Sequence, residues 1–113
     1  MKLLLLEDDD LLAESLAESL KDNGYLVDVA ASVQAAASFM ATEEYVLAIV
    51  DLGLPDGDGI GVLRSMLRRD WHGRSILITA YPDPTLRAVA SMNGFHAVLD
   101  KPIRQHELIA ALA

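Results

Sequence analysis

The chain contains no cysteine among its 113 residues. This absence excludes disulfide bonds, cysteine-ligated zinc and thiolate catalysis, and it argues against a redox function. The sequence also lacks an apolar run approaching the roughly 18 residues that cross a bilayer. No charged-then-apolar leader precedes a cleavage site. We therefore expect a soluble, cytosolic protein without a membrane segment.

Basic and aromatic residues are both scarce. Nine Lys and Arg against 17 Asp and Glu give a formal net charge of −8. Nucleic-acid binding depends on basic patches that displace counterions from phosphates, so we expect no direct contact with DNA or RNA. Trp71 and Tyr81 are isolated aromatics, which favours packing or interface roles. His72, His96 and His106 lack the spacing of metal ligands and are expected at the surface.

Apolar runs alternate with helical patterns along the chain, which predicts an α/β fold with a parallel sheet covered on both faces. The length corresponds to one domain covering residues 1–113. We expect five strands, at Lys2–Leu6, Leu26–Ala30, Val46–Val50, Ser75–Ile78 and Ala97–Leu99. We expect five helices, at Leu11–Leu20, Val33–Met40, Gly59–Arg69, Pro84–Met92 and Arg104–Leu112.

Short polar signals mark the helix ends. Asp9 or Asp10 is expected to cap the first helix, and Ser32 the second, because side-chain oxygens there accept bonds from free backbone amides. Asn23-Gly24 is a typical C-terminal stop for the first helix. The last helix reaches the end of the chain at Ala113, which suggests that the chain is part of a longer protein.

Acidic residues follow two of the strands. Glu7 and Asp8 come directly after the first strand, and Asp51 comes after the third. Ligands of open parallel sheets bind beyond the carboxyl ends of the strands, where the strand order reverses. If the first and third strands are neighbours, these three acids converge. The loops that carry Thr79 and Lys101 then reach the same edge.

Converging carboxylates need a cation. Two of them ~5 Å apart repel by roughly 3 kcal/mol at an effective dielectric constant of 20, and each raises the pKa of the others. An oxygen-lined site suits Mg²⁺, with Mn²⁺ as an alternative. A calcium-binding EF-hand over residues 51–62 is excluded, because Val62 replaces the required glutamate and Gly53 and Pro55 replace oxygen ligands.

With an ion present, Asp51 can act as a nucleophile and accept a phosphoryl group as an aspartyl phosphate. The ion would offset the charge on the phosphoryl oxygens. Lys101 would pair with one oxygen and the Thr79 hydroxyl with another. Lys101 is the only lysine beyond residue 21.

The ordered set Glu7-Asp8, Asp51 in Asp-Leu-Gly-Leu-Pro-Asp-Gly-Asp-Gly, Thr79-Ala80 and Lys101-Pro102 resembles the receiver domain of bacterial two-component response regulators. Each of these motifs alone is weak evidence for the family. Together, at separations of 43, 28 and 22 residues, they are specific and cover essentially the whole chain. The resemblance implies a flavodoxin-like (βα)5 three-layer sandwich with strand order 2-1-3-4-5. It also implies phosphorylation of Asp51 by a sensor histidine kinase or a histidine phosphotransfer protein.

The resemblance also implies individual roles. Asp8 and Asp51 would bind Mg²⁺ directly, Glu7 would act through water, and the Gly53 carbonyl would add a backbone ligand. Thr79 would be the switch hydroxyl.

Lys101 would bind the phosphoryl oxygen. The Lys101-Pro102 peptide would be cis, a form that is largely confined to proline. Pro55, Gly57 and Gly59 would shape the loop that leads into the third helix.

Three positions depart from the family pattern. Val98 stands where members carry Tyr, Phe or His, so the aromatic half of the usual switch is missing. Gly53 and Tyr81 occupy the two positions that tune phosphoryl lifetime, and a bulky Tyr81 would shield the site from water and slow self-dephosphorylation. Residues 94–97 lack the acidic pair of many dimeric members, which leaves a monomer or a phosphorylation-dependent dimer.

Other functions fit less well. A hydrolase with an aspartyl nucleophile would need an acid two residues after Asp51, where Gly53 stands. A flavin carrier would need a phosphate cradle after the first strand, where this chain has four acids. A degenerate receiver used only for binding is opposed by the retention of Asp51, Asp8 and Lys101, although Val98 mildly favours it. We therefore expect a phosphoacceptor that assists its own phosphorylation and dephosphorylation rather than an enzyme.

A DNA-binding output domain following Ala113 would make it a regulator of transcription.

Overall fold

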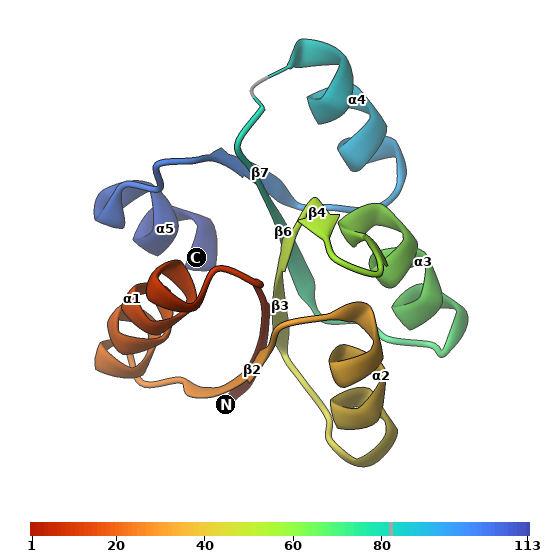
Figure 1. Cartoon of the computed structure of the whole chain (residues 1–113), viewed down its shortest axis with the longest axis horizontal. Helices are drawn as coiled ribbons and strands as arrows, with labels where there is room; N and C mark the ends of the chain where they lie inside the picture. Colours follow the sequence, from red (N-terminus) through yellow and green to blue (C-terminus); the bar gives the residue numbers. More distant parts are fainter. Residues whose placement is uncertain (82) are drawn as a thin grey trace.

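Five parallel strands form the central sheet of the computed structural model, which describes residues 1–81 and 83–113. The strands lie in the order β2-β1-β3-β6-β7 (Figure 1). This flavodoxin-like order confirms the expected one. The sheet strands are β1 (Lys2–Leu6), β2 (Leu26–Ala30), β3 (Leu47–Asp51), β6 (Arg74–Thr79) and β7 (Ala97–Asp100).

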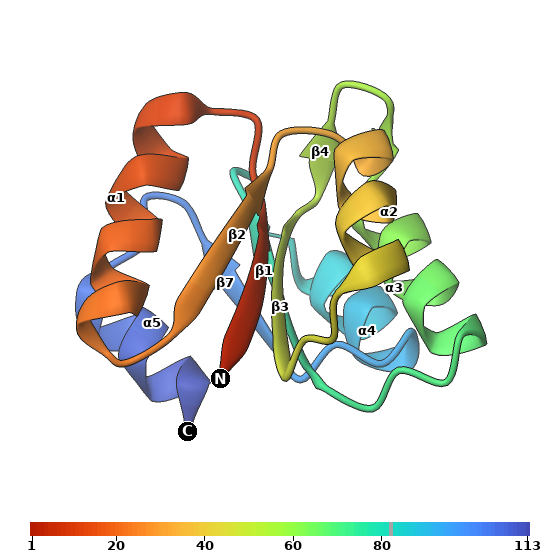
Figure 2. The ribbon, with the colours of Figure 1, turned by 90° about the horizontal axis from the view of Figure 1, so that it is seen from below.

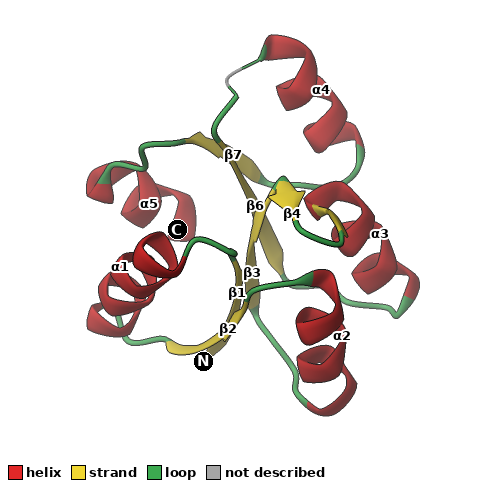
Figure 3. Cartoon of the chain, viewed as in Figure 1, coloured by secondary structure: helices red, strands yellow, loops and turns green. Residues whose placement is uncertain are grey.

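Helices cover both faces of the sheet, as Figures 2 and 3 show. The helices are α1 (Asp10–Asp22), α2 (Val33–Thr42), α3 (Gly59–Arg68), α4 (Pro84–Met92) and α5 (Gln105–Leu112). In Figure 2, α1 and α5 lie on one side of the sheet, and α2, α3 and α4 lie on the other. The three-layer arrangement expected from the sequence is therefore confirmed. Within the described part of the chain, no helix has the length and apolar character needed to span a bilayer.

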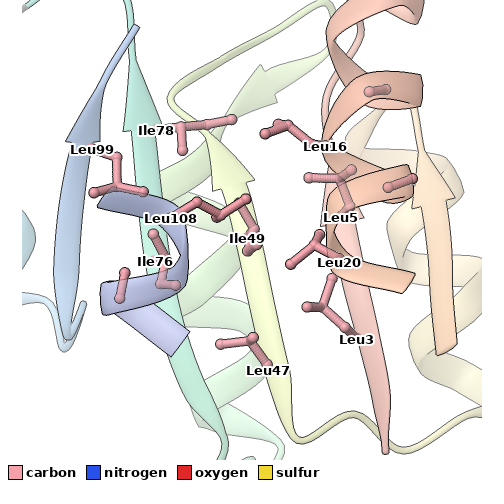
Figure 4. Close-up of a cluster of buried hydrophobic side chains, with 13 residues drawn as sticks. Leu3, Leu5, Leu16, Leu20, Leu47, Ile49, Ile76, Ile78, Leu99 and Leu108 are labelled. Atoms are coloured by element: carbon pink, nitrogen blue, oxygen red, sulfur yellow. The ribbon is translucent and has the colours of Figure 1, made fainter. Parts of the chain in front are cut away.

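The run of leucines in β1 supplies both hydrophobic cores. Side chains alternate along a strand, so Leu3 and Leu5 face α1 and α5 (Figure 4), while Leu4 and Leu6 pack toward the other three helices. All four are completely buried. A strand covered on both faces is apolar at every position, which explains the unbroken run.

The capping signals act as expected. The Asp9 carboxylate accepts bonds from the backbone amides at the start of α1, so Asp9 rather than Asp10 is the cap. The Ser32 hydroxyl caps α2 in the same way. Asn23 ends α1, and Gly24 follows with a φ of 91°, a conformation that glycine adopts without strain.

The strand ends differ slightly from expectation. β3 starts and ends one residue later than expected, so that Asp51 belongs to the strand. β6 and β7 extend through Thr79 and Asp100, which pair with each other. The apolar pattern stops before these polar residues, but the backbone ladder continues because it does not depend on side-chain polarity. α5 begins at Gln105 rather than Arg104, which is its cap residue.

A small hairpin follows β3 and was not predicted. Its strands are β4 (Gly53–Leu54) and β5 (Gly57–Asp58), paired antiparallel. The carboxylate of Asp56, in the turn, accepts bonds from the Val33 and Gln34 amides at the start of α2, at 2.8 and 3.1 Å. Because these partners lie more than 20 residues away in the sequence, local patterns could not indicate this contact.

Candidate functional site

The carboxyl ends of β1 and β3 bring three carboxylates together. β1 and β3 are neighbours, with Leu6 opposite Val50, so the acids that follow these residues meet at one edge. One side-chain oxygen from each of Glu7, Asp8 and Asp51 lies within 4.8 Å of the others. Glu7 and Asp51 are 1% and 6% exposed, whereas Asp8 is exposed. The predicted convergence is confirmed, and the cluster has a buried floor with one open side.

Lys101 reaches the cluster from the loop after β7. Its Nζ atom lies 2.8 Å from Oε1 of Glu7 and 3.2 Å from Oδ2 of Asp51. With all three carboxylates ionised, one ammonium would leave two negative charges uncompensated. One divalent cation carries the opposite charge, so the donor set fits a hard ion such as Mg²⁺.

Burial and neighbouring charges shift the protonation of this cluster. Burial raises the pKa of Glu7 to about 7, Lys101 opposes the shift, and the Asp51 carboxylate adds to it. Burial lowers the pKa of Lys101, but Glu7 and Asp51 more than offset this effect and raise it above its ordinary value. Lys101 therefore stays charged, and an added cation would favour the ionised form of Glu7.

A cavity of about 220 Å³ opens beside Asp51. Its lining combines residues from the ends of β3 and β6 and the loop after β7, namely Asp51, Leu52, Gly53, Thr79, Ala80, Tyr81 and Lys101. Thr79 is buried, and its Oγ1 accepts a bond from the Tyr81 amide at 3.0 Å. Tyr81 is 76% exposed. The acceptor, lysine and threonine positions expected from the sequence thus share one cavity.

A larger cavity of about 610 Å³ lies at the opposite end of the sheet, beside Tyr45 and Trp71. The Trp71 indole donates to the Tyr45 carbonyl at 2.8 Å, which is the packing role expected for it. This cavity contains none of the converging carboxylates, so we place the chemistry at the smaller one. The three histidines are exposed, as expected.

The backbone around Asp51 is closely packed. A Cβ atom on Gly59 would lie 2.5 Å from the Asp51 carbonyl oxygen and 2.8 Å from a Val50 methyl group. Only glycine therefore allows α3 to start against β3. The Gly53 amide donates to Oδ1 of Asp51 at 3.3 Å. The Lys101-Pro102 peptide is cis, the form that the family resemblance implies.

One contact near the site involves Arg87, for which the sequence analysis predicted no role. Arg87 on α4 donates to the Val98 carbonyl at 2.9 Å and to Oδ2 of Asp100 at 2.6 Å. Val98 itself is half-buried and packs with the core under α2, α3 and α4. The position of Asp100 directly before Lys101 is the only sequence signal for this contact.

The fold and the site together define a flavodoxin-like α/β protein with a carboxylate cluster at the carboxyl edge of its sheet. Residues 3–113 match the response regulator receiver domain. The chain belongs to this family, whose members act in two-component signalling.

Individual relatives agree with this assignment. The transcriptional regulatory protein PmrA of Pectobacterium parmentieri is 36% identical over 110 residues, which cover 97% of this chain and 50% of PmrA. This chain thus spans half the length of that relative. The signal receiver domain of a putative Luxo repressor protein from Vibrio parahaemolyticus has a TM-score of 0.92 and 29% identity, covering 98% of this chain and 85% of that one. A Burkholderia pseudomallei response regulator with a phosphorylated aspartic acid, calcium ion and citrate has a TM-score of 0.88 and 25% identity. The match covers 99% of this chain and 66% of that one.

Proposed function

We propose that this domain accepts a phosphoryl group on Asp51 from the phosphohistidine of a sensor kinase or a histidine phosphotransfer protein. One observation carries the proposal. Asp51 shares a cavity with Thr79 and Lys101, and its carboxylate also belongs to the cluster with Glu7 and Asp8. The phosphorylated aspartic acid of the Burkholderia pseudomallei relative supports this role.

The reaction depends on a divalent cation, Mg²⁺ or alternatively Mn²⁺. Asp8 and Asp51 hold the ion directly, Glu7 holds it through water, and the Gly53 carbonyl completes the protein ligands. When bound, the ion neutralises charge on the cluster and on the phosphoryl oxygens. The two uncompensated charges of the cluster support this assignment.

The side chains of the cavity have distinct tasks. A carboxylate oxygen of Asp51 attacks phosphorus, the new O–P bond forms, and the P–N bond breaks with its electron pair leaving on the donor imidazole. The Lys101 ammonium offsets charge on one phosphoryl oxygen. A hydroxyl has one proton to donate besides its lone pairs. Thr79 can therefore accept the bond from Tyr81 and still donate its proton to another phosphoryl oxygen.

The phosphorylated domain changes the surface that it presents to an output domain or a partner. PmrA is a transcriptional regulatory protein twice as long as the region matched here, which supports a DNA-binding output domain in the full protein. The charge of −8 assigns any DNA contact to that other domain. The receiver acts as a monomer or as a phosphorylation-dependent dimer. It assists its own phosphorylation and dephosphorylation and has no separate substrate.

Incubation with acetyl phosphate and Mg²⁺, followed by intact-mass measurement, tests this function. The wild type should gain the mass of one phosphoryl group, and chelation of the metal should prevent the gain. Asp51→Asn should gain none. Asp56→Asn is a matched control, because Asp56 lies in the hairpin that follows Asp51 but bonds to α2. A gain that persists in Asp51→Asn, or none in the wild type, would refute the proposal.

A further inference from the structure

The Arg87 side chain ties helix α4 to the end of strand β7. Figure 1 shows the positions of these two elements. The two guanidinium nitrogens of Arg87 bind separate acceptors, the carbonyl of Val98 and the carboxylate of Asp100. Both acceptors lie in β7, and the strand leads directly into Lys101. We call these two interactions the Arg87 clamp.

Asp100 is connected through the backbone to both residues that would bind the phosphoryl oxygens. It directly precedes Lys101 in the sequence, and it lies opposite Thr79 in the β6–β7 ladder. The Lys101 amide also donates to the Thr79 carbonyl at 2.7 Å. A backbone movement at Lys101 therefore reaches Asp100 through one peptide unit, and a backbone movement at Thr79 reaches it through the strand pairing.

The side chain of Val98 cannot carry such a movement to α4. It is branched at Cβ, has one rotatable bond and packs into the core. An aromatic ring at this position could swing between buried and exposed positions, but two methyl groups cannot make an equivalent movement. The clamp adds a polar connection through the Val98 carbonyl to the apolar packing between this strand and α4.

We propose that Arg87 couples helix α4 to the phosphorylation state, in place of the missing aromatic at position 98. The inference rests on the proposed phosphorylation of Asp51. In the present structure Lys101 lies against Glu7 and Asp51, and the clamp is closed. When Lys101 and Thr79 turn to phosphoryl oxygens, Asp100 follows them, the clamp opens and α4 loosens.

The clamp is weak enough to act as a switch. The side chains of Arg87 and Asp100 are 48% and 35% exposed, and exposed ion pairs stabilise a fold only slightly. Oδ1 of Asp100 is buried and has no hydrogen-bond partner among residues 1–81 and 83–113. An unsatisfied buried oxygen costs free energy, so a rearrangement that gives it a partner compensates in part for the lost ion pair.

Hydrogen–deuterium exchange of α4, measured before and after phosphorylation, tests the coupling. In the wild type, phosphorylation should raise exchange in α4 about threefold, as expected for loss of one exposed ion pair. Arg87→Gln should exchange faster from the start and show no further change, although intact mass shows wild-type phosphorylation. Asp100→Asn should behave like Arg87→Gln. Helix α1, on the other face of the sheet, serves as the internal reference.

Arg64→Gln is the matched control. The Arg64 guanidinium donates to the Asn93 side chain at the C-terminal cap of α4, 2.7 Å away, but not to β7. This variant should keep the wild-type response. The inference is wrong if phosphorylated Arg87→Gln still shows the wild-type change, if Arg64→Gln loses it as well, or if α4 of the phosphorylated wild type does not respond. Absence of any mass gain in the wild type would instead refute the proposed function, and the coupling with it.

Discussion

The Nζ atom of Lys101 lies closer to Oε1 of Glu7, at 2.8 Å, than to Oδ2 of Asp51, at 3.2 Å. The lysine assigned to the phosphoryl group thus also neutralises the buried acid at the bottom of the cluster. Glu7, Lys101 and a cation held by the cluster would therefore be linked electrostatically, and this linkage predicts how pH and substitution affect the domain.

The first prediction concerns pH and Glu7 in the metal-free domain. The pKa of Glu7 is raised from 4.5 to about 7 by burial, so the folded state binds a proton that the unfolded state releases. The contribution of this proton to the free energy of unfolding is fully present below pH 4.5 and is lost as the pH rises through about 7. The upper limit of the loss is about 3 kcal/mol. Urea unfolding in EDTA at several pH values should show this loss in the free energy of unfolding.

Glu7→Gln cannot titrate, so its stability should fall less than that of the wild type over the same pH range. Glu14→Gln, an exposed position on α1, should follow the wild type. A constant free-energy difference between the wild type and Glu7→Gln across this range would contradict the assigned shift.

The second prediction separates two effects of Lys101. Its ammonium pairs with two residues that would hold the ion, so Lys101→Gln should raise Mg²⁺ affinity, by about tenfold. The same substitution removes the positive charge from the phosphoryl oxygen and should slow phosphorylation at least about tenfold. Calorimetric titration with Mg²⁺ and intact-mass time courses measure the two effects. Lys21→Gln, on the last turn of α1, is the control. Changes of both quantities in the same direction would argue against this dual role.

The third prediction concerns Tyr81 at the cavity. Its large exposed side chain lines the space beside Asp51 and should hinder attacking water. Tyr81→Ala should therefore shorten the lifetime of the aspartyl phosphate by about fivefold, as measured by loss of the phosphorylated mass after the donor is removed. Met92→Ala removes a similarly exposed apolar side chain elsewhere and should leave the lifetime unchanged. An unchanged hydrolysis rate in Tyr81→Ala would show that the ring does not shield the site.

The fourth prediction compares two glycines of α3. A Cβ at position 59 would meet the Asp51 carbonyl at 2.5 Å, so Gly59→Ala must shift backbone and should cost about 1–3 kcal/mol of stability. It should also slow phosphorylation, because the acceptor strand moves. The nearest neighbour of a Cβ at position 61 lies 3.5 Å away, so Gly61→Ala should be tolerated. Thermal unfolding and phosphorylation rates of the two variants measure the difference, and equal behaviour would refute the packing argument.

The sequence by itself determined the fold class, the strand order through the family resemblance, and the positions of the acids. Buried strands are apolar at every position, and helix caps are local, so both can be predicted from short segments of sequence. The convergence of Glu7, Asp8 and Asp51 followed from the rule that the carboxyl ends of parallel strands share one edge.

Only the tertiary structure decided the contacts between distant segments. The bond of Asp56 to α2 spans 23 residues, and the Arg87 clamp joins a helix to a strand 11 to 13 residues away. The preference of Lys101 for Glu7 over Asp51 likewise depends on where three loops meet. Such contacts form between side-chain and backbone groups that packing brings together, and no local periodicity encodes them. The convergence of the acids could therefore be predicted from strand ends, whereas the contacts of Arg87 could not.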